Sequence, residues 1–200
     1  MTTESQPSTA FRTIDDLIAF LVQQATAAGE NPGFTALDHG LQCAYELTIA
    51  APDDVELQLA GLVHDIGHHL VIGDDAGHGR HGGDAVRHLL GHRVAALVEL
   101  HVPAKRYLVS VDPAYRAKLS PISVATLHRQ GGDMTVDEAA SFASHPLRAS
   151  ALELRNADEA AKVPNRKVPG LAHWIPLLAH MSADVDGSLA AGGAAGGAEQ

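Results

Sequence analysis

The segment LVHDIGHHL, residues 62–70, places three histidines and an aspartate in an otherwise apolar run. His64 and Asp65 directly follow the apolar Leu62 and Val63, so both side chains are expected at the buried end of a helix. A charge buried without a partner is costly, and these groups therefore need strong partners. A divalent cation is one such partner, because neutral imidazole and carboxylate are ligands for iron, manganese, zinc, cobalt and nickel. A mutual hydrogen bond at a helix end is the simpler alternative.

Other histidines and aspartates lie at the inner edges of further predicted helices and loops. The candidates are His39, His81, His101 and Asp158. Asp158 follows Leu154 by four residues and Leu147 by eleven, which places all three on one helical face. His101 likewise continues the face of Leu97. Together with the first motif, these residues provide enough donors for two metal ions if one aspartate bridges them.

The elements that must position these residues are all helices. Apolar periodicity and capping residues predict helices over 13–25, 35–50, 53–66, 82–101, from 135 onward, and over 146–162. Pro103 is expected to end or bend the helix that begins at residue 82. No segment alternates convincingly as a strand, so the predicted fold class is all-α. The predicted boundaries are a disordered N-terminal segment over 1–12, one domain over 13–186, and a disordered Gly/Ala-rich tail over 187–200.

Composition excludes several classes of protein. The 200 residues carry a net charge of −10, which argues against a nucleic-acid or anionic-membrane surface. The single cysteine, Cys43, cannot form an internal disulfide and suits a reducing compartment. Neither a long apolar run nor the plan of a signal peptide is evident, so a cytoplasmic protein without nucleic-acid or membrane partners is expected. Its oligomeric state is left open.

The order His … His-Asp … His … His … Asp resembles the HD-domain superfamily of helical metalloproteins in its six-ligand, two-metal version. The segments HVPAKRYL, DPAYRAKLSPISVATLHRQGG, TVDEAASFASHP and LRNADEAAK are more specific. They are similar to the branch of mixed-valent di-iron oxygenases that act on organophosphonates, of which the inositol oxygenases are more distant relatives. The resemblance covers about residues 14–180 and implies a single compact HD-domain helical bundle with a dinuclear metal site in its core.

The resemblance also implies a set of metal ligands. One iron would be held by His39, His64, Asp65 and Asp158. The second would share Asp65 as a bridge and be held also by His81 and His101. His78 is a rival to His81, but HGGDA followed by an apolar helix is the better match to the family pattern. The implied cofactors are two iron ions in a mixed-valent Fe(II)/Fe(III) state, with O2 as cosubstrate.

A phosphonate dianion needs its own binding groups beside the metals. The resemblance implies that they are His68, Lys105, Ser123, Thr126 and Arg155, with Asp65 and His68 as catalytic residues. Four of them have a simpler interpretation: Lys105 as a solvated lysine, Arg155 in an intrahelical pair with Glu159, and the two hydroxyl residues as helix caps. A guanidinium on the face of the ligand Asp158 would suit phosphonate oxygens, because its planar fork can bind two of them.

The implied reaction is O2-dependent cleavage of the carbon–phosphorus bond of a small-molecule 1-hydroxyphosphonate to a carboxylate and phosphate. Relatives that act on aminophosphonates carry a tyrosine and a glutamate in the loop before the first histidine ligand. Here that loop has Gly29 at the tyrosine position and Glu30 out of register, so the substituent on the substrate is left open. The same ligands could instead serve a metal-dependent phosphohydrolase acting on a phosphomonoester or nucleotide, or a non-catalytic module.

Overall fold

The computed structural model of the chain describes residues 10–26 and 34–195, with side chains described up to residue 186. Within that part of the chain the helices are α1 (Ile14–Gln23), α2 (Ala36–Ala50), α3 (Val55–Val63), α4 (Gly67–Leu70), α5 (His78–Val111), α6 (Pro113–Lys118), α7 (Pro121–Arg129), α8 (Val136–Ala143), α9 (Arg148–Ala160) and α10 (Leu171–Ala195). No strand forms among the described residues, which confirms the all-α prediction.

Three helices begin where the capping threonines predicted. Thr13, Thr35 and Thr135 each cap a helix, and each is answered by an acidic side chain three residues later that accepts from the backbone of the capping threonine. The short helices α4, α6 and α7 and the long α10 were not predicted, because their apolar faces are short or irregular. Both α6 and α7 begin with a proline, whose missing N–H costs nothing in a first turn.

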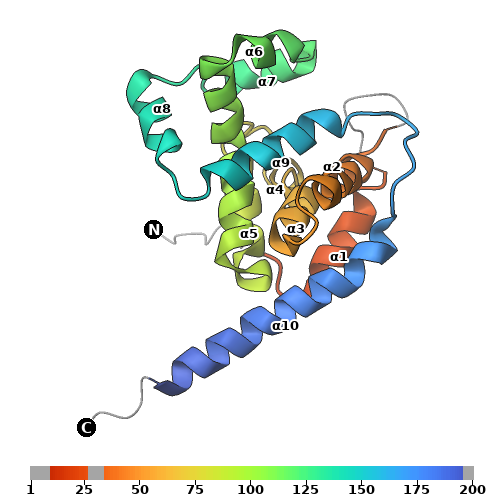
Figure 1. Cartoon of the computed structure of the whole chain (residues 1–200). Coiled ribbons are helices and arrows are strands. Elements are labelled where there is room, and N and C mark those ends of the chain that lie inside the picture. Colours follow the sequence, from red (N-terminus) through yellow and green to blue (C-terminus); the bar gives the residue numbers. More distant parts are fainter. Residues whose placement is uncertain (1–9, 27–33, 196–200) are drawn as a thin grey trace, which may run out of the picture.

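Helix α5 connects the two ends of the molecule (Figure 1). Its lower part packs against α3, α4 and α10, and its upper part reaches α6 and α8. Pro103 was expected to end or bend this helix, and the structure shows that the helix does not end there. The helix continues to Val111 and is interrupted instead at Gly91, which has φ +86°. Val102 and Ala104 are both buried, so packing on either side holds the proline within the helix.

The core divides unequally between these ends. One large cluster joins residues of α1, α2, α3, α5, α9 and α10. Two small clusters, centred on Phe142 and on Tyr115, support α8 and the α6–α7 pair. In the large cluster α2 and α3 pack closely, because a Cβ at Gly40 would lie only 2.4 Å from the carbonyl oxygen of Leu62. This contact brings His39, the neighbour of that glycine, beside the end of α3.

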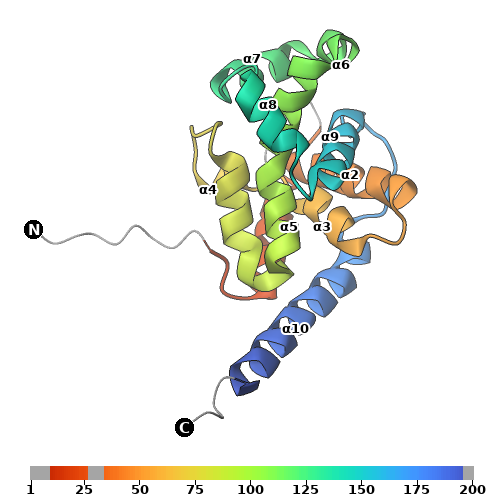
Figure 2. The same cartoon turned by 60° about the vertical axis from the view of Figure 1, so that its left-hand side comes forward.

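Helix α10 crosses the base of the bundle and extends beyond it (Figure 2). Trp174 and Leu178 anchor its first turns in the core. The helix runs on to Ala195, past residue 187 where the tail was expected to begin, in keeping with the high helix propensity of alanine. At the other end Phe11 is buried and its N–H bonds the carbonyl of Ala85, so the packed region begins before residue 13. The segments 1–9 and 196–200 lie outside the described residues.

None of the helices in the described part of the chain is both long enough and apolar enough to cross a bilayer.

Candidate metal centre

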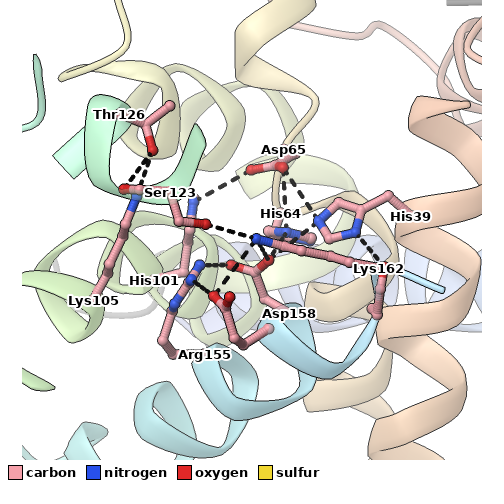
Figure 3. A network of polar contacts seen from close by, with 12 residues as sticks. His39, His64, Asp65, His101, Lys105, Ser123, Thr126, Arg155, Asp158 and Lys162 are labelled. Carbon is pink, nitrogen blue, oxygen red and sulfur yellow. Dashed lines mark hydrogen bonds and ion pairs between the residues drawn. The ribbon is translucent and has the colours of Figure 1, made fainter. Parts of the chain in front are cut away.

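A cluster of imidazoles and carboxylates lies where α2, α3, α5 and α9 meet (Figure 3). The end of α3 contributes His64 and Asp65, while α2 contributes His39, α5 contributes His101 and α9 contributes Asp158. His64, His101 and Asp158 are almost completely buried, at 0%, 3% and 3% exposure. The structure therefore brings together five of the six metal ligands expected from sequence.

Each imidazole of the cluster is oriented by a backbone carbonyl. Nδ1 lies 2.8 Å from the oxygen of Ala161 in His39, 2.8 Å from that of Gly61 in His64, and 2.6 Å from that of Val98 in His101. A carbonyl only accepts, so Nδ1 must carry the proton and Nε2 keeps its lone pair. All three Nε2 atoms lie near the carboxylates of the cluster. This is the arrangement that fixes a histidine as a metal ligand.

Asp65 lies between two groups of these donors. Its Oδ2 is 3.5 Å from Nε2 of both His39 and His64, and its Oδ1 is 3.5 Å from Nε2 of both His101 and His78. Asp158 joins the first group, with Oδ1 3.2 Å from Nε2 of His39. Ligands bound at about 2.0–2.2 Å to one metal lie roughly 3–3.5 Å apart. The spacing suits one cation on each side of a bridging Asp65.

The sixth expected ligand, His81, lies elsewhere. Its Nε2 is 2.8 Å from Oδ2 of Asp74, which lies in the loop before α5. His78 takes its place: it is 1% exposed, its Nδ1 lies 2.6 Å from the carbonyl of Asp75, and its Nε2 faces Asp65. Gly67 makes this possible, because a Cβ there would lie 1.9 Å from the carbonyl oxygen of His78. The preference for His81 over His78 is thus not supported by the geometry.

Two features of the cluster call for a cation. Nε2 of His64 is buried and has no hydrogen-bond partner among the described residues. Nε2 of His78 lies 2.8 Å from Nε2 of His101, although the Nδ1 protons of both rings face carbonyls. Two lone pairs at that distance repel each other unless a proton or a cation lies between or beside them. The donor set, all nitrogen and oxygen, suits a divalent first-row transition metal.

The ionisation of the cluster is strongly coupled. Burial lowers the pKa of His101 to about 3, which keeps this ring neutral. Burial also opposes charge on His64, but the neighbouring Asp65 raises the pKa of His64 to about 9. Burial would raise the pKa of Asp65, yet the surrounding histidines hold it well below its usual value. Without a cation the cluster therefore balances the Asp65 charge with a proton, which a divalent metal would replace.

A second group of side chains forms a polar pocket beside the cluster. Asp65, His101 and Asp158 line it from the metal side. The rest of the lining includes all five residues expected to bind the phosphonate: His68, Lys105, Ser123, Thr126 and Arg155. Lys105 and Arg155 are each 4% exposed, so neither is the solvated surface cation of the simpler interpretation. We call this space the anion pocket.

Side chains hold one another in place in the anion pocket. The ammonium of Lys105 donates to Oγ1 of Thr126 at 2.6 Å, and Nε of Arg155 donates to the hydroxyl of Tyr115 at 2.5 Å. The guanidinium of Arg155 also pairs with Asp158 and Glu159. The expected intrahelical pair with Glu159 therefore exists, and it holds the guanidinium beside the metal ligand. The cap of α7 is Ser120, so Ser123 and Thr126 are not needed as caps.

Lys162 was missed by the sequence analysis. It lies four residues after Asp158, lines the anion pocket, and donates to Oγ of Ser123 at 3.1 Å. Burial, with the nearby charges of Arg155 and Lys162, lowers the pKa of Lys105 to about 7. The pocket is therefore short of negative charge, and a dianion would relieve the repulsion among its cations.

His68 closes the pocket from α4. Its ring stacks on that of His78, with centroids 3.7 Å apart and planes 14° apart, and its Nδ1 lies 3.3 Å from Oδ1 of Asp75. Asp75 pairs in turn with Arg129 of α7. Asp75 thus positions both histidines: its carboxylate contacts His68, and its backbone carbonyl contacts His78. The loop carrying Gly29 and Glu30 lies outside the described residues, while Phe34 is buried and its ring lies across that of His39, with centroids 6.2 Å apart and planes at 67°.

The amino-acid sequence is similar to the sequences of several known proteins. No family model matches the sequence. Hydroxymethylphosphonate dioxygenase of Gimesia maris is 38% identical over 149 residues, which are 70% of this chain and 74% of that protein. The glycine-betaine-forming [1-hydroxy-2-(trimethylamino)ethyl]phosphonate dioxygenase of Leisingera caerulea is 31% identical over 74% of this chain and 79% of its own length. The uncharacterized protein L432 of Acanthamoeba polyphaga mimivirus is 31% identical over 72% of this chain and 70% of its own length. The chain belongs to the family of the phosphonate dioxygenases.

Proposed function

We propose that the protein is an O2-dependent oxygenase that cleaves the carbon–phosphorus bond of a 1-hydroxyphosphonate to a carboxylate and inorganic phosphate. One observation carries the proposal: a cluster of metal donors and a group of buried cations line the same cavity. The two relatives named as dioxygenases of hydroxyphosphonates support the choice of reaction.

The metal centre of this proposal uses the donors described above. His39, His64 and Asp158 would hold one iron, His78 and His101 the other, with Asp65 shared between them. Such a mixed-valent Fe(II)/Fe(III) pair would supply the redox chemistry needed to activate O2. The protein's own part is to leave Nε2 of each imidazole without a proton, so that this atom can bind a metal. The backbone carbonyls that accept from Nδ1 support that role.

The anion pocket would hold the phosphonate. Lys105 and Arg155 would neutralise its charge, and the hydroxyls of Ser123 and Thr126 would donate to its oxygens. Because the pKa of Lys105 is about 7, arrival of a dianion would favour the protonated form of this lysine. His68 would bound the pocket on the metal side. These contacts orient the carbon that bears the hydroxyl and the phosphorus toward the metals.

The overall reaction balances without an external reductant. The carbon–phosphorus bond breaks, the carbon is oxidised to the carboxylate level, and O2 takes up the four electrons released. Both oxygen atoms of O2 are accounted for in the carboxylate and phosphate products. The substituent on the carbon stays undefined, because the loop over 27–33 lies outside the described residues.

A hydrolytic alternative rests on the same pocket. The lysines and the arginine would bind a phosphomonoester as readily as a phosphonate, with a metal-bound water as the attacking group. The test is to load the protein anaerobically with iron, supply hydroxymethylphosphonate, and follow O2 consumption and phosphate release together. One O2 consumed per phosphate supports the oxygenase. Phosphate release from esters without O2, sustained by manganese or zinc, would favour the hydrolase.

Low-temperature EPR on the partly oxidised iron protein provides an independent measurement. A coupled spin-half signal that shifts when hydroxymethylphosphonate is added is the expected result. Failure to take up iron, or a signal insensitive to the phosphonate, would contradict the proposed centre.

A further inference from the structure

The two metal positions of the proposed centre are not equally supplied with donors. Beside the shared Asp65, the first position has three further donors, and the second has two, His78 and His101. Two imidazoles and one carboxylate leave several coordination positions of an iron ion open. A further imidazole near the second position could therefore fill one of them.

His68 of α4 lies close enough to do so. A nitrogen of its ring and one ligand atom each of Asp65 and His78 all lie within 4.8 Å of one another. Among the described residues one other group has this spacing, and Asp65 belongs to both. Two ligands bound to one metal at 2.0–2.2 Å are at most about 4.4 Å apart, so a small inward tilt of the His68 ring would suffice.

His68 is oriented in the same way as the expected metal ligands. Its Nδ1 lies 3.3 Å from Oδ1 of Asp75, just as Nδ1 of His78 lies 2.6 Å from the backbone oxygen of that residue. A carboxylate beside Nδ1 favours a proton on this atom and leaves the lone pair on Nε2. The rings of His68 and His78 are stacked, with Nδ1 of both facing Asp75. Nε2 of His68 is therefore the nitrogen left for a cation.

His68 is held less firmly than the other four imidazoles around Asp65. Its side chain is 29% exposed, whereas theirs are at most 12% exposed. Its Nδ1 contact is 3.3 Å long, compared with 2.6–2.8 Å for the others, and α4 is a single turn. The ring also lines the anion pocket, so an anion that fills this pocket meets it. Such an imidazole can bind a metal and can also leave it.

We propose that His68 is a reversible ligand of the second metal, bound in the ligand-free protein and released when an anion fills the anion pocket. The proposal rests on the proposed function only in taking the donors around Asp65 as a metal centre. It adds a second role to the contact with substrate that the sequence predicts for His68, because the released ring would border the phosphonate. One position of the second metal would then open only after the phosphonate has bound.

The first test titrates Co2+ into the metal-free protein by anaerobic calorimetry. His68→Phe keeps a ring that can stack on His78 but has no donor atom. His69→Phe is the matched control, because His69 is the next residue of α4 and belongs to neither group of closely spaced donors. We expect His68→Phe to weaken the second Co2+ at least about tenfold and His69→Phe less than about twofold. In His68→Ala, which leaves room for a free ring, added imidazole should restore the affinity.

Proton NMR of the cobalt protein tests the release. Each imidazole bound to Co2+ should give one exchangeable, paramagnetically shifted N–H signal, so the ligand-free parent should show five. Methylphosphonate should reduce the number to four, and His68→Phe should show four with or without it.

Each part of the proposal can fail separately. Four signals in the ligand-free parent, or an unchanged affinity for the second Co2+ in His68→Phe, would overturn the ligation of His68. Five signals that persist with bound methylphosphonate would overturn its release. Neither measurement needs turnover, so a protein with this ligand set but without O2-dependent phosphate release would refute the proposed function alone.

Discussion

The metal cluster and the anion pocket share a cavity but are organised in opposite ways. In the cluster each imidazole of His39, His64, His78 and His101 is held by a backbone carbonyl through Nδ1. In the pocket the functional groups are held by other side chains, as Lys105 is by Thr126 and Arg155 by Tyr115. The cluster belongs to the large core, whereas α6 and α7 are supported by a small cluster around Tyr115.

This difference indicates that the metal cluster is rigid before any ligand binds, whereas the anion pocket can adjust to its ligand. Backbone carbonyls of the packed helices and of the loop before α5 orient the metal donors independently of any ligand, so the centre is preorganised. The cations of the pocket repel one another and depend on a few side-chain bonds, so the pocket is completed by its ligand. Variants in the two regions should therefore fail differently: cluster variants in metal content and pocket variants in ligand affinity.

The largest effect is expected from the matched pair His78→Ala and His81→Ala. His78→Ala removes a donor that faces Asp65, so iron content should fall to about half and turnover at least about 100-fold. His81→Ala should keep full iron content, because the side chain of His81 contacts Asp74 and not Asp65. Iron analysis and phosphate release measure both. Loss of iron in His81→Ala with retention in His78→Ala would reverse our placement of the second metal.

Arg155→Lys should give the next largest effect. A lysine cannot reproduce contacts to Tyr115, Asp158 and Glu159 together with a two-point contact to the phosphonate. We expect kcat/KM to fall about 100-fold, corresponding to roughly 3 kcal/mol, while iron content stays within a third of the parent. Arg116→Lys serves as the control, since Arg116 is half-exposed and pairs with Asp133. Iron loss equal to the activity loss would show that the arginine supports the cluster rather than the pocket.

Lys105→Met should separate binding from stability. Phosphate affinity should fall about tenfold because a buried charge is lost. The ligand-free variant should be more stable by about 1 kcal/mol, because the folded state no longer holds a cation beside Arg155 and Lys162. The lysine pKa is lowered on folding, so its charge opposes folding below about pH 7, and the penalty fades as pH rises toward 10.5. Chemical denaturation at several pH values tests this, and a destabilised variant at pH 6 would contradict it.

The smallest expected effect is the uptake of a proton when an anion binds. Because the pKa of Lys105 is about 7 in the free protein, anion binding above pH 7 should take up a proton. Calorimetry in buffers of different ionisation enthalpy at pH 8 should show uptake of up to about one proton beyond the ligand's own titration. Lys105→Met should abolish this excess. Equal uptake in the variant and the parent would assign the proton to another group.

Much of the arrangement could be predicted from sequence because it depends on neighbours along the chain. The capping boxes at Thr13, Thr35 and Thr135 are local, and the structure contains each of them. Asp158 follows an apolar helical face, and that periodicity suffices to direct it into the core. The motif HDIGHHL likewise follows a buried helix, so the direction of His64 was predictable.

The choice between His78 and His81 was not predictable in this way. Both follow a glycine-rich loop and lie three residues apart on one helix, so sequence spacing hardly separates them. The close approach of α4 to α5 at Gly67 turns His78 inward, and that contact exists only in the folded chain. Lys162 was overlooked for the same reason: it follows α9 and contacts Ser123 of α7, a residue far from it in the chain.

The sequence by itself determined that the chain is helical, where most long helices begin, and that histidines and aspartates end on buried faces. These properties follow from periodicity, capping and the cost of burying charge, all of which act over a few residues. Only the tertiary structure decided which donors share a cation and which cations share an anion. Those choices depend on how closely helices pack, as where Gly40 meets Leu62, and on distances between residues far apart in the chain.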